Sequence, residues 1–120
     1  MKQITVIIGG KNTGKTLKAK ELSLGFKNDE IFWDLQPFEY VSSIREFYQK
    51  KIKRKTKILI VDECNDSIFI SNLILLSKYN HLMSNFGKFK IIIICDDNIK
   101  AADIQKKSLN LKIDLDIIEP

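Results

Sequence analysis

The sequence predicts an α/β fold, a three-layer sandwich in which helices cover both faces of a five-stranded parallel sheet. Five short apolar runs alternate with segments of helical periodicity along the 120 residues, and this alternation is typical of strands joined by right-handed helical crossovers. Two of the runs, 57–62 and 90–95, are continuously apolar between their first and last residues, as strands covered on both faces are. The length suits a single domain, 1–120, with one sheet and one set of packed helices.

The predicted strands are the five apolar runs, at 4–8, 30–35, 57–62, 90–95 and 112–118. The last run alternates polar and apolar side chains, so we expect it at an edge of the sheet with one face towards solvent. Helices are predicted over 16–26, 37–53, 67–85 and 99–109. We expect Asp66 or Ser67 to cap the third helix, and Asp97 or Asn98 to cap the fourth.

Composition is that of an ordinary globular domain, with 44% hydrophobic and 29% charged residues. No apolar run approaches the ~20 residues that span a bilayer. The first three residues lead directly into a strand, which is not the pattern of a signal peptide. The two cysteines, Cys64 and Cys95, lack the spacing of a metal site. These features predict a cytoplasmic protein (in the host cytoplasm if the chain is viral) with reduced, apolar cysteines.

The segment 9–16, GGKNTGKT, meets every requirement of a phosphate-binding P-loop. It follows an apolar strand and precedes a helix, so its backbone N–H groups can surround a phosphate at the positive end of that helix. Gly9 and Gly14 stand where a side chain would block the turn. We expect Lys15 to reach the β- and γ-phosphates and the Thr16 hydroxyl to bind Mg²⁺. The predicted nucleotide contacts are Gly9, Gly10, Lys11, Asn12, Thr13, Gly14, Lys15, Thr16 and Leu17.

A second acidic motif ends the strand 57–62, where Asp62 is followed directly by Glu63. Buried strands seldom end in adjacent carboxylates without a cation to balance them. The pattern resembles a Walker B motif, in which Asp62 would hold Mg²⁺ through water and Glu63 would polarise the water that attacks the γ-phosphate. The alternative is that both carboxylates only cap the following loop.

Together the two motifs resemble the additional-strand, catalytic-glutamate division of P-loop NTPases, which includes RecA-like, AAA+ and FtsK/HerA-type ATPases. The resemblance covers essentially the whole chain and depends on Glu63 following Asp62 and on the extra strand 30–35 between the motifs. It implies the strand order 5-1-4-3-2. It also implies a polar sensor after the strand 90–95, where Asn98 or Asp97 would fix the attacking water. Asn98 completes our predicted catalytic set with Lys15 and Glu63, although both sensor candidates have the alternative of a simple helix cap.

The resemblance implies Mg²⁺-dependent ATP hydrolysis that drives or switches work on nucleic acid, in the layout of small viral or mobile-element ATPases that handle or package DNA. The Gln that usually follows the fourth strand in the FtsK/HerA-like members is missing. ATP is favoured over GTP because no Asn-Lys-x-Asp element is present. The division usually takes an arginine or lysine finger from a neighbouring subunit, and neither Arg45 nor Arg54 sits at its usual place. A finger could come from Lys78, Lys88 or Lys100, from a second copy in a homo-oligomer or from another protein. We expect weak activity from the isolated monomer.

Other interpretations stay open. The chain could be a regulatory nucleotide switch with little hydrolysis, or a small-molecule phosphotransferase, which the lack of an Arg-rich lid disfavours. The basic segment 50–57 is either a contact for nucleic-acid phosphates or a solvated helix end. Its predicted place, on the side of the sheet away from the nucleotide, favours the second interpretation. The apolar start of the helix 67–85 either lies in the core or forms part of a subunit interface, while Trp33 and His81 have only core or surface interpretations.

Overall fold

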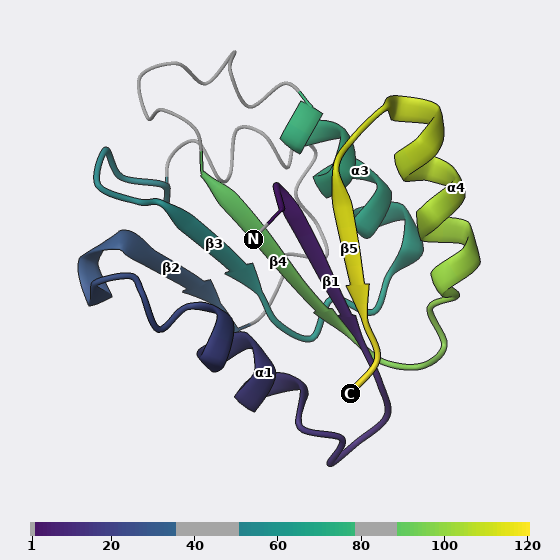
Figure 1. Ribbon diagram of the computed structural model, residues 1–120, viewed down its shortest axis with the longest axis horizontal. Helices are drawn as coiled ribbons and strands as arrows, with labels where there is room; N and C mark the ends of the chain where they lie inside the picture. Colours follow the sequence, from purple (N-terminus) through teal and green to yellow (C-terminus); the bar gives the residue numbers. More distant parts are fainter. Residues whose placement is uncertain (1, 36–50, 79–88) are drawn as a thin grey trace.

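The computed structural model describes residues 2–35, 51–78 and 89–120, which form an α/β fold around one five-stranded sheet (Figure 1). The strands are β1 (Ile4–Ile8), β2 (Ile31–Asp34), β3 (Ile58–Val61), β4 (Lys90–Cys95) and β5 (Leu115–Ile118). Their order is β2-β3-β4-β1-β5, and each neighbouring pair in it is parallel. This is the predicted order read from the opposite edge, so the α/β class, the parallel sheet and the strand order are confirmed.

The helices cover both faces of the sheet (Figure 1). They are α1 (Lys15–Leu22), the short 3-10 helix η1 (Asn28–Glu30), α3 (Ser67–Lys78) and α4 (Ala101–Leu111). Ala19 of α1 packs in one buried cluster with Ile7 and Ile60 of the sheet. Ile70 of α3 and Ile104 of α4 belong to a second buried cluster, formed with the side chains on the other face. The described residues therefore form three layers.

Strands β3 and β4 are continuously apolar because both of their faces are buried. Successive side chains of a strand point to opposite faces, so Ile58 and Ile60 face α1 while Leu59 and Val61 face α3 and α4. The four central isoleucines of β4, 91–94, alternate in the same way and are at most 1% exposed. Each side of the sheet thus has its own apolar core.

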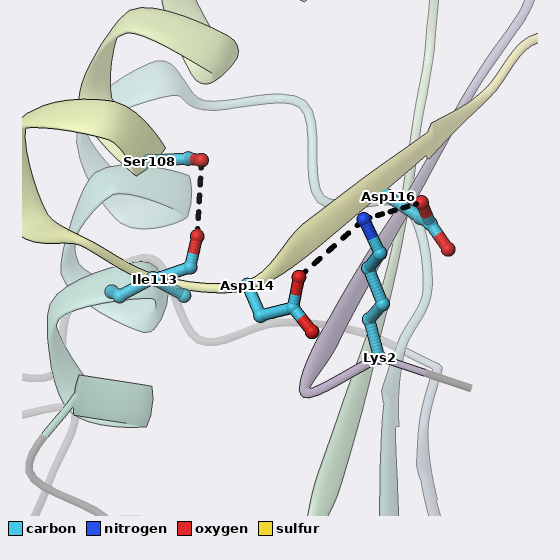
Figure 2. A network of polar contacts seen from close by, with 5 residues as sticks. All are labelled: Lys2, Ser108, Ile113, Asp114 and Asp116. Carbon is cyan, nitrogen blue, oxygen red and sulfur yellow. Dashed lines mark hydrogen bonds and ion pairs between the residues drawn. The ribbon is translucent and has the colours of Figure 1, made fainter.

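The fifth strand is shorter than predicted, because the chain before it belongs to the end of α4. Lys112 adopts a left-handed backbone (φ 55°) as the C-cap of that helix. Ile113 then donates its N–H to the carbonyl of Ser108 at 3.0 Å. In return, the Ser108 hydroxyl donates to the carbonyl of Ile113 at 3.2 Å (Figure 2). These bonds satisfy groups at the helix end, and the strand begins only at Leu115.

The edge position predicted for the fifth strand is confirmed, because β5 is the outermost strand and pairs with β1. Lys2 Nζ lies 3.4 Å from a carboxylate oxygen of Asp114 and 3.4 Å from one of Asp116 (Figure 2). These contacts, with Asp114 first, raise the pKa of the Lys2 ammonium. Since the three side chains are largely exposed, the ion pairs contribute little stability, and the backbone pairing with β1 holds the edge.

The helix ends follow local hydrogen bonds. Asp66 caps α3 as predicted, since its Oδ1 accepts the N–H groups of Ile68 at 2.8 Å and Phe69 at 3.2 Å. The cap predicted for the fourth helix is wrong. Its N-cap is Lys100 without a side-chain bond, because the preceding residues form a separate turn in which Asn98 N–H donates to Asp96 Oδ1 at 3.1 Å.

Several predicted features lie outside the described residues. They include most of the helix 37–53, of which only Lys51 is described as helical, and the end of the helix 67–85. Arg45, His81 and Lys88 also lie there. Among residues 2–35, 51–78 and 89–120, no helix is long and apolar enough to cross a membrane.

Glu30 joins η1 to the segment that enters β3. Its carboxylate accepts the N–H of Lys27 at 2.8 Å and lies 2.8 Å from the ammonium of Lys57. Its carbonyl also accepts the N–H of Lys57 at 2.7 Å. The bond from Lys27, followed by that from Lys57, lowers the pKa of the Glu30 carboxyl.

We expect the variant Glu30→Gln to lose less stability in acid than the wild type. The unfolded chain has the ordinary glutamate pKa of about 4.3, so it takes up the proton first as the pH falls. The contribution of Glu30 is therefore complete above that value and disappears as the pH falls through the lowered folded pKa. Urea unfolding between about pH 7 and about pH 3 measures this. A difference between the two proteins that stays constant over the whole range would contradict the prediction.

Candidate nucleotide-binding site

The carboxyl ends of the neighbouring strands β1, β4 and β3 lie on the same side of the sheet, because the strands are parallel and all point towards the lower right of Figure 1. The glycine-rich loop leaves β1 there, the acidic motif leaves β3, and the loop 96–100 leaves β4 between them. Ligands of open parallel sheets bind outside this edge, where successive loops diverge. The strand order therefore brings together three loops that are far apart in the sequence.

The glycine-rich loop closes tightly on itself. Thr13 Oγ1 donates to the carbonyl of Gly10 at 2.8 Å, and a Cβ added to Gly9 would lie 2.5 Å from the same hydroxyl oxygen. Gly14, the N-cap of α1, has φ 82° but nothing within 4 Å of an added Cβ. A Cβ at Gly9 would thus have to displace the Thr13 side chain, and one at Gly14 is disfavoured by the backbone conformation.

Lys15 connects this loop to the end of β4. Its Nζ donates to the carbonyl of Gly9 at 2.6 Å and to the carbonyl of Cys95 at 3.2 Å. The Cys95 carbonyl also accepts the N–H of Gly9 at 3.2 Å. Thr16 and Leu17, in the first turn of α1, are exposed, as are the loop residues Lys11, Asn12 and Thr13. The half-buried ammonium therefore lies over the ends of two strands, beside the free N–H groups of a helix start.

Asp62 follows β3 and has both carboxylate oxygens hydrogen-bonded. Its Oδ1 accepts the N–H of Glu63 at 2.8 Å, and its Oδ2 accepts the indole N–H of Trp33 at 3.3 Å. Strand alternation continues the α1 face from Ile58 and Ile60 to Asp62. The half-buried carboxylate is therefore directed to the face that carries α1.

Glu63 stands out from the sheet edge. Its backbone is left-handed (φ 51°) and its side chain is exposed. Such a conformation is uncommon for a residue other than glycine and is often found at functional sites. It lets the next residue rejoin the sheet, since Cys64 N–H donates to the carbonyl of Ile94 at 2.9 Å and the Cys64 thiol is buried.

The loop after β4 separates the two sensor candidates. A Cβ added to Gly10 would lie 3.3 Å from Asp97 Oδ2, so this carboxylate is beside the glycine-rich loop. Asp97 and Lys100 also line a depression of about 400 Å³ with residues of that loop. Asn98 lines a different groove, between α3 and α4. Asp97 is thus the candidate placed against the loop, and the catalytic role of Asn98 stays a prediction.

The donors available for a metal ion are few. In the described parts of the chain, no three His, Cys, Asp or Glu side chains form a group that could hold one. Mg²⁺ is usually bound through one or two carboxylates together with water and substrate phosphates. The Asp62 carboxylate and the Thr16 hydroxyl, the ligands predicted from the sequence, would need a nucleotide to supply the remaining ligands.

Sequence reasoning missed the groups that hold the motifs in place. Trp33 was assigned only to core or surface, yet it binds Asp62. Asn65 accepts the N–H of Asp96 at 2.7 Å through its Oδ1 and so joins the loops after β3 and β4. The only signal in the sequence was that Asn65 comes two residues after the acidic pair.

Both cysteines are buried and unbridged. Burial raises the pKa of the Cys64 thiol and that of Cys95, the latter to about 12, so neither is a reactive thiolate at neutral pH.

In the basic segment, Lys55 and Lys57 lie 3.6 Å and 2.8 Å from carboxylates of η1. These pairs reduce the positive charge of the segment 50–57 and favour a solvated helix end over a nucleic-acid contact.

Comparison with known families gives no match to any family model, and comparison with curated proteins gives none either.

A pair of glycine variants tests the backbone constraint in the loop. Gly14→Ala should destabilise the fold by about 1–2 kcal/mol, because a Cβ is disfavoured at its left-handed backbone. Gly25→Ala is the matched control, since nothing lies within 4 Å of its added Cβ and its φ is not positive. Urea unfolding should show Gly25→Ala within about 1 kcal/mol of the wild type. Equal stability of both variants would contradict the constraint.

Proposed function

We propose that this chain is a Mg²⁺-dependent P-loop ATPase of the additional-strand, catalytic-glutamate division. The observation that carries the proposal is the place of β4 between β1 and β3. This is the strand order that the resemblance implies for that division. Because β4 lies between β1 and β3, the loop after β4 lies between the glycine-rich loop and the acidic motif.

The glycine-rich loop is the proposed phosphate cradle. Its backbone N–H groups and the start of α1 favour an anion. Lys15 is held over the loop by two carbonyl oxygens, so its ammonium is available to exchange these neutral partners for charged phosphate oxygens. Charge-assisted bonds of that kind are about twice as strong as neutral ones.

Thr16 and Asp62 are the proposed Mg²⁺ ligands, Asp62 acting through water. Mg²⁺ at this position would neutralise charge that develops on the phosphates. Asp62 is suited to the task because its carboxylate is half-buried and held at both oxygens. Thr16 has an exposed hydroxyl in the first turn of α1.

Glu63 is the proposed base that orients and deprotonates the attacking water. Its exposed carboxylate follows the metal ligand directly, and its left-handed backbone lifts it out of the strand. Asp97, beside Gly10, or Asn98 would hold the same water from the β4 side. General-base assistance of this kind contributes about 10²–10⁴-fold to a rate.

The proposed biological output is work on nucleic acid or a protein partner in the cytoplasm. Of the candidate finger residues within the described chain, Lys100 lines the depression beside Gly10. Lys78 is the last residue of α3, and Arg54 precedes the amino end of β3, on the side of the sheet away from the glycine-rich loop. If Lys100 is not the finger, a second copy of the chain or another protein would supply it.

Steady-state ATP turnover with Mg²⁺ tests the proposal. Glu63→Gln should lower kcat by about 10²–10⁴-fold while calorimetry shows ATP still bound, because only the base is removed. Lys15→Ala should lose both binding and turnover. Glu21→Gln and Lys20→Ala, on exposed positions of α1, are matched controls that should behave as the wild type.

The three functions in view give different results in this assay. Tight ATP binding without turnover in the wild type would replace hydrolysis by a nucleotide switch. Turnover only with a phosphate acceptor would indicate a phosphotransferase. Stimulation by single- or double-stranded DNA would support work on nucleic acid.

We also expect turnover per chain to increase with protein concentration. A finger from a neighbouring subunit supplies positive charge in the transition state, and dilution would remove it. Turnover measured over a hundredfold range of chain concentration, beside the mass of the particle by light scattering, checks this. A rate per chain that is constant across the range would argue for a finger within the chain. In that case Lys100→Ala should abolish ATP turnover.

A further inference from the structure

The indole of Trp33 connects the edge strand β2 to the acidic motif. Trp33 lies opposite Ile60 of β3 in the parallel register and packs, partly buried, on the cluster that faces α1. Its Nε1 reaches Asp62, which directly follows β3 and lies two residues after Ile60, and donates to Oδ2 at 3.3 Å. Asp62 is also tied to β2 through its backbone, because its N–H donates to the carbonyl of Asp34 at 2.8 Å.

The Asp62 carboxylate is therefore held at two points. The N–H of Glu63 binds one oxygen and the indole of Trp33 binds the other. Each carboxylate oxygen has two lone pairs, so each keeps one for a further ligand. Because an indole N–H only donates and has one direction, it restricts rotation of the carboxylate.

Packing alone does not account for this contact. Phe32, the neighbouring residue of β2, packs against the opposite cluster and offers an apolar ring without a donor. A phenylalanine at position 33 would fill most of the same space. The tryptophan adds one N–H, and the acceptor of that N–H is the carboxylate at the end of β3.

We infer that Trp33 is a positioning residue, which holds the Asp62 carboxylate in the orientation that binds Mg²⁺ with the nucleotide. The inference rests on the proposed role of Asp62 as a metal ligand. Groups that orient a metal ligand from behind contribute about 10–100-fold to metal affinity or activity. In this fold the task belongs to the additional strand, which lies at the edge of the sheet beside β3.

The first experiment compares the Mg²⁺ requirement of the wild type and Trp33→Phe at saturating ATP. We expect the Mg²⁺ concentration for half-maximal turnover to increase by about 10–100-fold in Trp33→Phe, with a smaller change in kcat once Mg²⁺ saturates. Phe32→Leu is the control on the same strand. It should lower the unfolding midpoint through lost packing and leave the Mg²⁺ requirement unchanged.

A second experiment needs no change at position 33. Trp33 is the only tryptophan of the chain, so its emission reports directly on the environment of the indole. Titration of the wild type with ATP should change the emission in the presence of Mg²⁺ and much less in its absence. In Asp62→Ala the Mg²⁺-dependent part should disappear.

The outcomes distinguish this inference from the function on which it rests. Wild-type hydrolysis with an unchanged Mg²⁺ requirement in folded Trp33→Phe would overturn the positioning role alone. Emission that does not respond to Mg²⁺ and ATP, while calorimetry shows both bound, would do the same. A wild type that neither binds nor hydrolyses ATP in Mg²⁺ would overturn the proposed function and the inference with it.

Discussion

Parallel pairing on both sides of β4 is the constraint on which the rest of the structure depends. The strand is buried on both faces between β1 and β3, so its peptide groups must find partners in those two strands. At its end the Cys95 carbonyl accepts from both the backbone of Gly9 and the ammonium of Lys15. Asn65 then ties the loop after β3 to Asp96. The arrangement of the candidate site is thus a consequence of strand order.

The sequence predicts the bounds of β1 and β4 more closely than those of β5. The observed bounds of β1 and β4 are those predicted, because an apolar run buried on both faces has no other environment and ends where polar or glycine residues begin. Alternation is a weaker signal. It assigned 112–114 to a strand, although these residues complete the end of α4 and lead out of it, since an amphipathic edge strand and an amphipathic helix end both place apolar residues at short intervals.

The residues of the candidate site also differ in how far the sequence predicts them. Residues that the proposed chemistry requires at fixed spacing within one motif, such as Gly9 and Lys15 in the first motif and Asp62 in the second, can be proposed from the sequence. Residues that act across the sheet cannot, because Trp33 and Asp62 are 29 positions apart, and Asn65 and Asp96 are 31 apart. Their contacts depend on strand register and on the left-handed turn at Glu63, and no local pattern encodes either of these.

Charge at this edge of the sheet places a condition on the proposed function. Asp62, Glu63, Asp96 and Asp97 all follow the ends of β3 and β4, while the described contacts of the Lys15 ammonium are with neutral carbonyl oxygens. A triphosphate that entered alone would bring further negative charge towards these carboxylates. The repulsion is stronger for the half-buried Asp62 and Asp96 than for the exposed Glu63 and Asp97, because water screens exposed charges. A divalent cation that enters with the nucleotide removes the conflict, because it binds phosphate and carboxylate oxygens together. The same acidic residues that oppose a free anion would therefore select the metal-bound nucleotide.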